Sequence, residues 1–167
     1  MKPKLVREYL SPLMGKSKEE VLRAFRDLIK NNKGDLDLSM LTSLPEGVEF
    51  NNEGYVNLDS LTSLPEGVEF NNKGNVSLWS LTSLPEGVQF NNKGDVGLRS
   101  LTSLPEGVKF NNKGNVYLWS LTSMSDGVKF NNKGYVDLGS LTNLPEDVEF
   151  NNHGCRVYLK NKAIEIK

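Results

Sequence analysis

The sequence predicts a mostly β fold, a single parallel β-solenoid of six 20-residue coils with an N-terminal α-helical cap and a C-terminal strand cap. The first observation behind this prediction is a uniform internal repeat, one copy of which reads NVSLWSLTSLPEGVQFNNKG over residues 75–94. A fixed period of this length is typical of solenoids, in which each repeat forms one turn stacked on the next. The six copies follow one another without insertion and begin at Asp35, Tyr55, Asn75, Asp95, Asn115 and Tyr135.

The second observation is that six positions of the repeat are apolar in every copy. The pairs V-x-L and V-x-F alternate apolar and variable residues, which is the pattern of a short strand with one buried face. Pro-Glu-Gly and Asn-Asn-Lys-Gly separate these segments and are turn-forming sequences. We therefore expect short strands joined by turns, with the apolar columns inside the solenoid. In the copy over residues 75–94 these columns are represented by Val76, Leu78, Leu81, Leu84, Val88 and Phe90.

The third observation is that one coil is too short to fold alone. A 20-residue repeat cannot bury its apolar side chains without neighbours, so the coils must stack and share ladder hydrogen bonds. The asparagine pairs of the NNKG turn, from Asn51-Asn52 to Asn151-Asn152, are expected to stack as amide ladders. A structural role is the preferred interpretation of these amides, and ligand binding is the alternative.

Residues 1–34 depart from the repeat and are predicted to form the helical cap. Ser17 followed by Glu20 has the spacing of a capping box, which satisfies free N–H groups at the start of a helix. An earlier short helix is predicted over residues 5–10. The main helix would cover the open end of the solenoid, and the alternative is a helix that binds a partner. Its apolar face consists of Val21, Leu22, Phe25, Leu28 and Ile29.

Residues 155–167 are predicted to close the other end of the solenoid. Valine occupies the third position after the last repeat, at Val157, so the register shifts by one residue here. We expect two closing strands, over residues 157–159 and 163–166. Lysines in and around these strands discourage pairing with a further strand edge. These lysines are Lys160, Lys162 and Lys167.

The segment Leu-Thr-Ser-Leu-Pro-Glu-Gly, as at residues 81–87, resembles the corner of bacterial leucine-rich repeats. That family has a longer L-x-x-N-x-L segment before the corner, and here serine fills the asparagine position. The resemblance covers residues 35–154 and implies a compact leucine-rich-repeat-like solenoid, or a separate parallel β-solenoid with convergent corners. The repeats are also similar to those of uncharacterised bacterial and phage proteins. The resemblance implies a binding module and no reaction.

Composition restricts the classes of function. The net charge is -1 and 25% of the residues are charged, without the basic excess of a protein that coats nucleic acid. The single cysteine, Cys155, cannot form an internal disulfide and fits a reducing compartment. The sequence has no signal-peptide pattern at its start and no apolar run of the roughly 18 residues that a membrane helix needs. We therefore expect a cytoplasmic protein without membrane contact.

The copies differ mainly around the V-x-L strand, in three columns that point outward. Both tryptophans of the protein stand in one of these columns, with Arg99 between them, and Arg99 can stack on either indole. Exposed Trp, Tyr and Arg are enriched in the hot spots of protein interfaces. Drift at tolerant surface positions is the alternative explanation. The predicted partner-binding residues are Tyr55, Asp59, Trp79, Arg99, Tyr117, Trp119 and Tyr135.

These observations predict a non-enzymatic, monomeric solenoid that binds a protein partner through the variable V-x-L face. The resemblance adds a more specific hypothesis, an inhibitor of a bacterial defence protein encoded by a phage or mobile element. Catalysis has little support, because His153 and Cys155 are the only residues of their kinds and no nucleophile has a base at hand. We expect neither a cofactor nor a bound metal ion.

The alternative hypothesis is nucleic-acid binding, or competition with nucleic acid, through lysines in the turns. Lysine recurs in the NNKG turn, and a neighbouring column becomes basic in the C-terminal half. A solvated turn is the simpler interpretation, and phosphate binding would make the affinity strongly dependent on salt. The candidate anion-binding residues are Lys93, Lys109, Lys113, Lys129 and Lys133.

Overall fold

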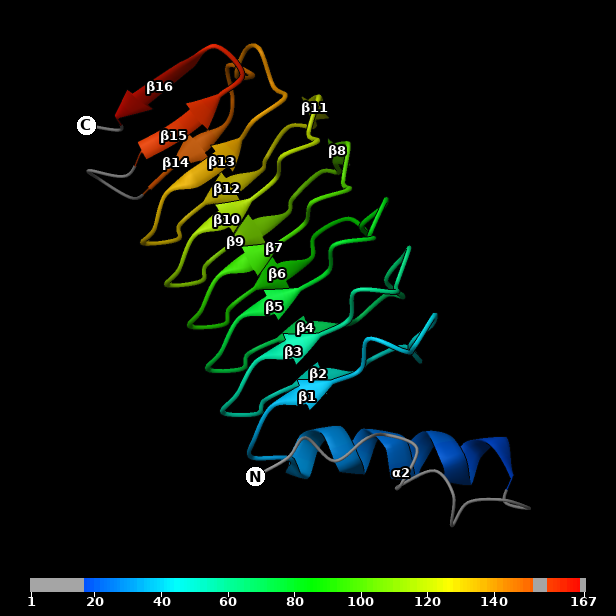
Figure 1. Ribbon diagram of the computed structural model, residues 1–167. Helices are drawn as coiled ribbons and strands as arrows, with labels where there is room; N and C mark the ends of the chain where they lie inside the picture. The colour runs from blue at the N-terminus through cyan, green and yellow to red at the C-terminus, as the bar shows by residue number, and fades with distance from the viewer. Residues whose placement is uncertain (1–16, 152–155, 166–167) are drawn as a thin grey trace.

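The computed structural model describes residues 17–151 and 156–165 and is a parallel β-solenoid (Figure 1). Its coils are stacked along one axis, with helix α2 (Lys18–Asn31) at the N-terminal end and a strand hairpin at the C-terminal end. The predicted fold class is therefore confirmed. The short helix predicted over residues 5–10 lies outside the described residues.

The V-x-L segments form the largest sheet, which we name the V-x-L sheet. Its coil strands are parallel, and Leu36 of the first strand lies opposite Val56 of the next. The same 20-residue register continues through the following coils. The strands are β1 (Leu36–Asp37), β3 (Val56–Asn57), β5 (Val76–Ser77), β7 (Val96–Gly97), β10 (Val116–Tyr117) and β13 (Val136–Leu138).

The V-x-F segments form a second parallel sheet on the opposite side of each coil. Its strands are β2 (Glu49–Phe50), β4 (Glu69–Phe70), β6 (Gln89–Phe90), β9 (Lys109–Phe110), β12 (Lys129–Phe130) and β14 (Glu149–Phe150). A third, two-stranded sheet joins β8 (Ser103–Leu104) to β11 (Ser123–Met124) ahead of the Pro-Glu-Gly corner. The sequence pattern did not predict this third sheet.

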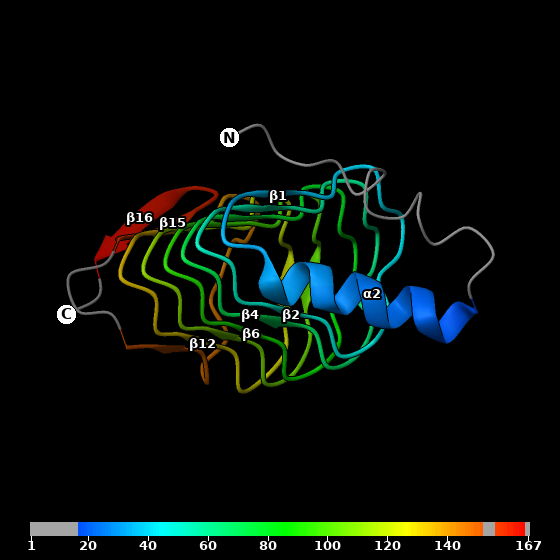
Figure 2. The same cartoon turned by 90° about the horizontal axis from the view of Figure 1, so that it is seen from below.

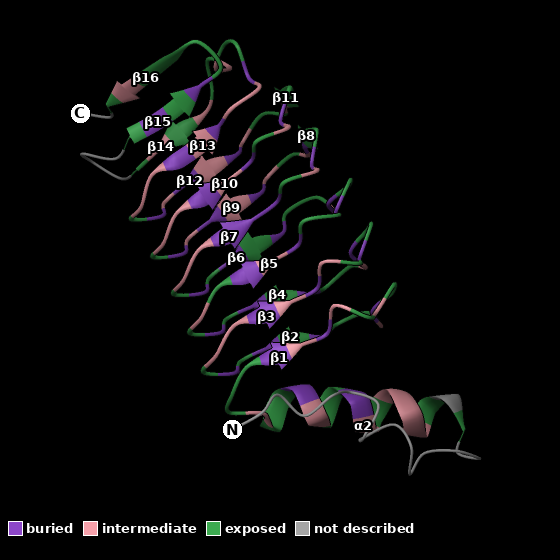
Figure 3. Ribbon diagram, viewed as in Figure 1, coloured by how far each residue is buried: buried purple, intermediate pink, exposed green. Residues whose placement is uncertain are grey.

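The apolar columns meet between the two main sheets, as predicted (Figure 3). The phenylalanines of the V-x-F sheet form one continuous stack, with ring centroids 4.9–5.3 Å apart and nearly parallel planes. Phe50 to Phe130 in this stack are completely buried. Because each ring packs on the ring of the next coil, burial in one coil depends on its neighbours.

Helix α2 covers the N-terminal end of the coils (Figure 2). The predicted capping box is present: the Ser17 hydroxyl accepts from the Glu20 N–H at 3.3 Å, and the Glu20 carboxylate accepts from the Ser17 N–H at 2.9 Å. Phe25 and Ile29 are buried against the first coil. Arg26 donates to the carbonyl of Glu46 at 2.7 Å. The helix therefore caps the apolar core and attaches to the corner of the first coil.

The C-terminal hairpin extends the V-x-L sheet through β15 (Arg156–Leu159) and β16 (Lys162–Glu165). Val157 lies opposite Val136, which confirms the predicted one-residue shift in register. Strand β16 then pairs antiparallel with β15. Both strands begin one residue earlier than predicted, and residue 166 lies outside the described part of the chain.

The two asparagine columns behave differently, which corrects the prediction of two amide ladders. The outer column forms a ladder from Asn71 to Asn151, with Nδ2 to Oδ1 distances of 2.7–3.1 Å. Members of the inner column are completely buried and donate to backbone carbonyls. For example, Asn72 donates to the carbonyls of Gly54 and Gly74 at 3.1 and 3.0 Å. The inner amides bind the turns of two successive coils together.

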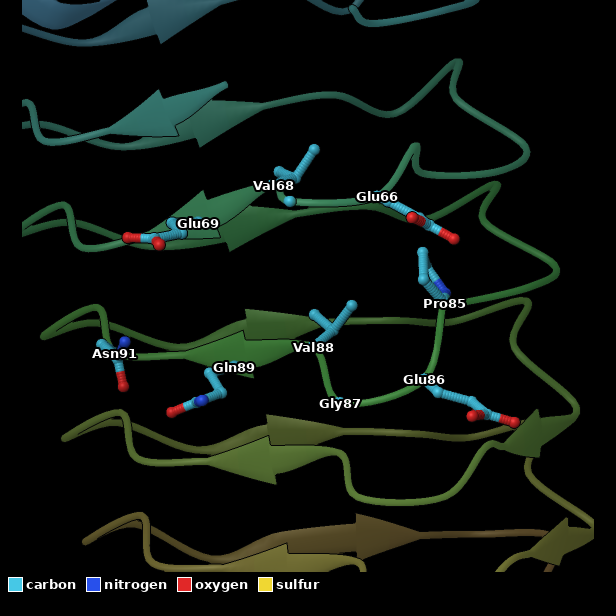
Figure 4. Close-up of a pocket in the computed structure, with 10 residues that line it drawn as sticks. Glu66, Val68, Glu69, Pro85, Glu86, Gly87, Val88, Gln89 and Asn91 are labelled. Carbon is cyan, nitrogen blue, oxygen red and sulfur yellow. The ribbon is translucent and has the colours of Figure 1, made fainter. Parts of the chain in front are cut away.

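The junction between the second and third coils is open at the Pro-Glu-Gly corner. The Gly87 N–H donates to the Glu106 carbonyl at 2.9 Å, as Gly47 does to Glu66 at 3.1 Å. Between the second and third coils, both fully described, no equivalent bond joins Gly67 to residue 86. Instead a groove of about 630 Å³ separates the two corners (Figure 4).

Candidate protein-binding face

The outward side chains of the V-x-L sheet form the surface that we name the variable face. It comprises the first, third and fifth positions of each repeat, which start with Asp35, Asp37 and Ser39 in the first coil. The valines and leucines between them point into the core and are buried. Because alternate residues of a strand point to opposite sides, the side chains that differ between coils are gathered on one face.

Two tryptophans stand on this face, and they are among the few large apolar side chains that are exposed. Trp79 is 50% exposed and Trp119 is 41% exposed. The guanidinium carbon of Arg99, which lies on the intervening coil, is 5.2 Å from the centre of the Trp119 ring. Of the two stacking arrangements open to Arg99 in the sequence, the structure has the one on Trp119.

A chain of aromatic rings extends from Trp119 toward the C-terminal hairpin. Tyr117 meets Trp119 edge to face at 5.8 Å, and Tyr135 meets Tyr117 in the same way at 5.5 Å. The chain continues to Tyr158, whose ring is 5.6 Å from that of Tyr135. Such perpendicular contacts are favourable geometries for aromatic pairs. The rings form one continuous cluster over the last coils and the hairpin.

Tyr158 was missing from the predicted site, although the sequence contained a signal for it. Val157 shifts the register by one residue, so Tyr158 occupies the place that Asp137 has in the preceding coil. Alignment of the hairpin with the repeat, shifted by one residue, places Tyr158 on the variable face.

Hydrogen bonds fix the orientation of these rings. The Tyr135 hydroxyl donates to the Tyr117 hydroxyl at 2.9 Å, and Asn115 donates to the same oxygen at 3.3 Å. The indole N–H of Trp119 donates to Asp137 at 3.1 Å. The hydrogen bond with Tyr117, followed by partial burial and nearby negative charge, raises the pKa of Tyr135 to about 12. Tyr135 is therefore a neutral hydrogen-bond donor at physiological pH.

A groove of about 360 Å³ lies on the variable face above Gly97. A Cβ atom on Gly97 would lie 2.9 Å from the indole nitrogen of Trp79, so glycine lets this indole rest against the strand. Because Gly97 has no side chain, the surface of the fourth coil is recessed between the aromatic side chains of the coils on either side. Residues around the groove include Ser77, Trp79, Asp95, Arg99, Tyr117 and Trp119.

Two of the predicted residues lie one coil before the groove. Asp59 accepts from the Ser77 hydroxyl at 2.6 Å and from the Trp79 N–H at 3.1 Å, so it positions the segment that carries Trp79. Tyr55 is on the same coil as Asp59, and partial burial together with Asp37 and Asp35 raises its pKa. The other five predicted residues adjoin the groove or belong to the aromatic cluster.

The first column of the variable face has a structural role that the sequence analysis missed. A side-chain oxygen of one coil accepts from the backbone N–H of the next coil in this column. The Asn75 oxygen accepts from Asp95 at 2.9 Å, and the Asp95 oxygen accepts from Asn115 at 2.7 Å. The bonds from Tyr55 to Asp35 and from Tyr135 to Asn115 are equivalent. Asp or Asn fills four of the six positions of this column, and this recurrence was the available signal.

The candidate anion-binding lysines lie away from the variable face. Lys109 and Lys129 are neighbours on strands β9 and β12 of the V-x-F sheet, and Lys93, Lys113 and Lys133 occupy exposed turn positions. Lys129 donates to Glu149 at 2.8 and 2.9 Å, and this hydrogen bond lowers the pKa of the Glu149 carboxyl. One of the five positive charges is therefore balanced by a carboxylate.

The larger groove, at the open corner between the second and third coils, differs from the Gly97 groove in the side chains that line it. Its carboxylates include Glu66 and Glu86, which point outward from successive corners (Figure 4). An acidic residue recurs at this position in every coil. The corner carboxylates therefore do not distinguish one coil from another, and Glu69 and Gln89 come from the column around this groove that varies.

Residues 17–151 and 156–165 bring together no group of three or more His, Cys, Asp or Glu side chains that could hold a metal ion. The same part of the chain contains no helix with the length and apolar character that a membrane crossing requires. His153 and Cys155 lie outside the described residues.

Comparison of the chain with protein-family models, curated proteins and solved structures finds no match. The likeness to leucine-rich repeats therefore remains a likeness of the corner sequence. What the structure shows is the coarser feature, a parallel β-solenoid with a 20-residue period.

Proposed function

We propose that this chain is a non-enzymatic solenoid that binds a protein partner through the variable face. The observation that carries the proposal is the pair of tryptophans on either side of the Gly97 groove, which are 50% and 41% exposed. Exposed aromatic surface is costly in water unless something covers it, and clustered apolar patches mark interaction sites. Trp, Tyr and Arg are also the residues that dominate binding energy at protein interfaces.

The order of the aromatic side chains supports the same proposal. Edge-to-face contacts and hydrogen bonds hold Tyr117, Trp119 and Tyr135 in place before any partner arrives. A surface that is already ordered loses little side-chain entropy on binding. Inhibition of a bacterial defence protein, a phage or mobile-element origin, a monomeric state and a cytoplasmic location stay predictions.

The test is capture of the partner by wild-type protein and by the Trp79→Ala/Trp119→Ala variant. We expect the variant to lose at least about 100-fold in affinity for a protein that wild type captures, because hot-spot truncations cost about 2 kcal/mol or more each. Met40→Ala is the matched control, since Met40 is an apolar side chain that is 85% exposed outside the groove. Circular dichroism checks that all variants fold. Equal capture by the double variant would contradict the proposal.

The lysine columns remain a second candidate site, for nucleic acid. The supporting observation is that Lys93, Lys113 and Lys133 are exposed at equivalent turns of successive coils. Binding through them would weaken steeply as salt increases, because phosphate contacts release counterions. An affinity for nucleic acid that does not change between low and physiological salt would exclude this candidate.

A further inference from the structure

We infer that the partner segment that enters the Gly97 groove is basic, with a lysine or arginine side chain between the two indoles. This inference rests on the proposed function and adds the chemistry of the partner. Across the six coils the variable face carries five carboxylates and a single cation, Arg99, and the hairpin that extends the face adds one further cation, Arg156. The surface therefore complements a positively charged segment. The carboxylates belong to Asp35, Asp37, Asp59, Asp95 and Asp137.

The fold itself does not require the negative charge in the first column. Asn75 accepts from the backbone of the next coil at 2.9 Å, and Asn115 does so at 3.1 Å. Asp35 and Asp95 perform the same task at 3.0 and 2.7 Å. An uncharged amide oxygen is thus sufficient to accept the hydrogen bond from the next coil. The negative charge of Asp95 is therefore available to a ligand.

The groove brings an acidic group and an aromatic surface together in its lining. Asp95 precedes and Arg99 follows strand β7, and both line the groove on either side of Gly97. Arg99 already covers Trp119, whereas no cation of the described residues lies over Trp79. A basic side chain that enters from the Asp95 end would lay its apolar stem on the indoles and its charge on the carboxylate.

An acidic partner segment fits this surface poorly. Its charge would meet the carboxylate of Asp95 in the groove and those of Asp59 and Asp137, which are hydrogen-bonded to Trp79 and Trp119. Like charges brought together at an interface are repulsive and select against such partners. The single favourable contact, with Arg99, already belongs to the stack on Trp119.

The two tryptophans make a direct test practical, because they are the only ones in the protein and both line the groove. Their fluorescence is followed while hexa-arginine, hexa-glutamate or an uncharged Gly-Ser hexapeptide is added. We expect a saturable change with hexa-arginine only. The Asp95→Asn variant should bind hexa-arginine about fivefold more weakly, because it loses one charge pair and keeps the backbone hydrogen bond. Asp126→Asn, an exposed position outside the groove, removes the same charge as a matched control.

The outcomes separate this inference from the proposed function. Equal binding of hexa-glutamate, equal binding by Asp95→Asn, or no response to hexa-arginine would overturn the basic partner. A partner that Asp95→Asn captures as well as wild type, but that Trp79→Ala/Trp119→Ala loses, would also overturn it while supporting protein binding. Loss through Asp95→Asn and retention by the Asp126→Asn control would support both.

Discussion

The buried and the exposed aromatic residues of this solenoid are arranged in opposite ways. Inside, the phenylalanines from Phe50 to Phe150 are the same residue in every coil and stack with nearly parallel planes. Outside, the aromatic side chains differ from coil to coil and meet at angles of 79–87°. Repetition inside allows each coil to pack on an identical neighbour, whereas variation outside gives each coil its own chemistry.

This difference indicates that stability and recognition depend on different positions of the repeat. A repeated inward column provides the interface between adjacent coils, from which a solenoid obtains its stability. An outward side chain that is half exposed, such as Trp79, contributes less to that interface and can therefore change at a smaller cost in stability. The comparison predicts that inward and outward substitutions of similar size have very different effects.

The largest effect on stability is expected for Phe90→Ala. Phe90 is completely buried, and its ring stacks on those of Phe70 and Phe110, both 5.2 Å away. Truncation leaves a cavity in the centre of the stack and should lower the free energy of unfolding by about 3–5 kcal/mol. The outward counterpart, Trp79→Ala, should lower it by less than about 1 kcal/mol. Equilibrium chemical denaturation followed by circular dichroism measures both, and similar losses would contradict the comparison.

A smaller effect is expected from the asparagine columns, which repeat the same contrast within one turn. Asn92 is completely buried, and its Nδ2 donates to three backbone carbonyls. Asn92→Leu leaves these carbonyls without their donor and should lower the free energy of unfolding by about 1–3 kcal/mol. Asn91→Leu, at the exposed neighbouring position in the amide ladder, should change it by about 0.5 kcal/mol at most. A larger loss for Asn91→Leu in the same denaturation experiment would show that the outer ladder is the stabilising one.

Much of this architecture could be predicted because each position of the repeat occurs six times, which makes its buried or exposed environment clear from the sequence. The inward columns, the parallel register, the capping box at Ser17 and the register shift at Val157 all follow from spacing. The position of Trp79, Arg99 and Trp119 on one outward column follows from the alternation of strand residues. Each of these features depends on local periodicity, which the sequence contains directly.

Other features could not be predicted because they depend on contacts between coils. The corners at Gly67 and Gly87 have the same Leu-Pro-Glu-Gly-Val sequence, yet hydrogen bonds to the following coil form at Gly87 and not at Gly67. Identical sequences cannot encode that difference by themselves. The inner asparagines were expected to pair with one another, but their N–H groups donate to the turn carbonyls instead. The groove above Gly97 likewise required the orientation of the Trp79 indole.

The smallest effect concerns the hydrogen bond that orders the exposed cluster. The hydroxyl of Tyr117 is the main reason that the pKa of Tyr135 is raised to about 12 from an ordinary value of 10.0. Tyr117→Phe removes this partner, so the pKa of Tyr135 should fall toward its ordinary value. Tyrosinate absorbance during an alkaline titration measures the shift. Tyr158→Phe is the control, because the Tyr158 ring contacts Tyr135 edge to face and no hydrogen bond of the described residues joins their hydroxyls.

The same titration has a consequence for stability whose direction can be stated. A pKa that is higher in the folded than in the unfolded protein means that folding favours the protonated Tyr135. This contribution is complete below pH 10 and is lost as the pH rises from 10 toward the folded pKa of about 12. Wild-type protein should therefore lose more stability than Tyr117→Phe in this interval. If both proteins lose the same amount, the hydroxyl pair does not order the cluster, and the perpendicular ring contacts alone hold the variable face in place.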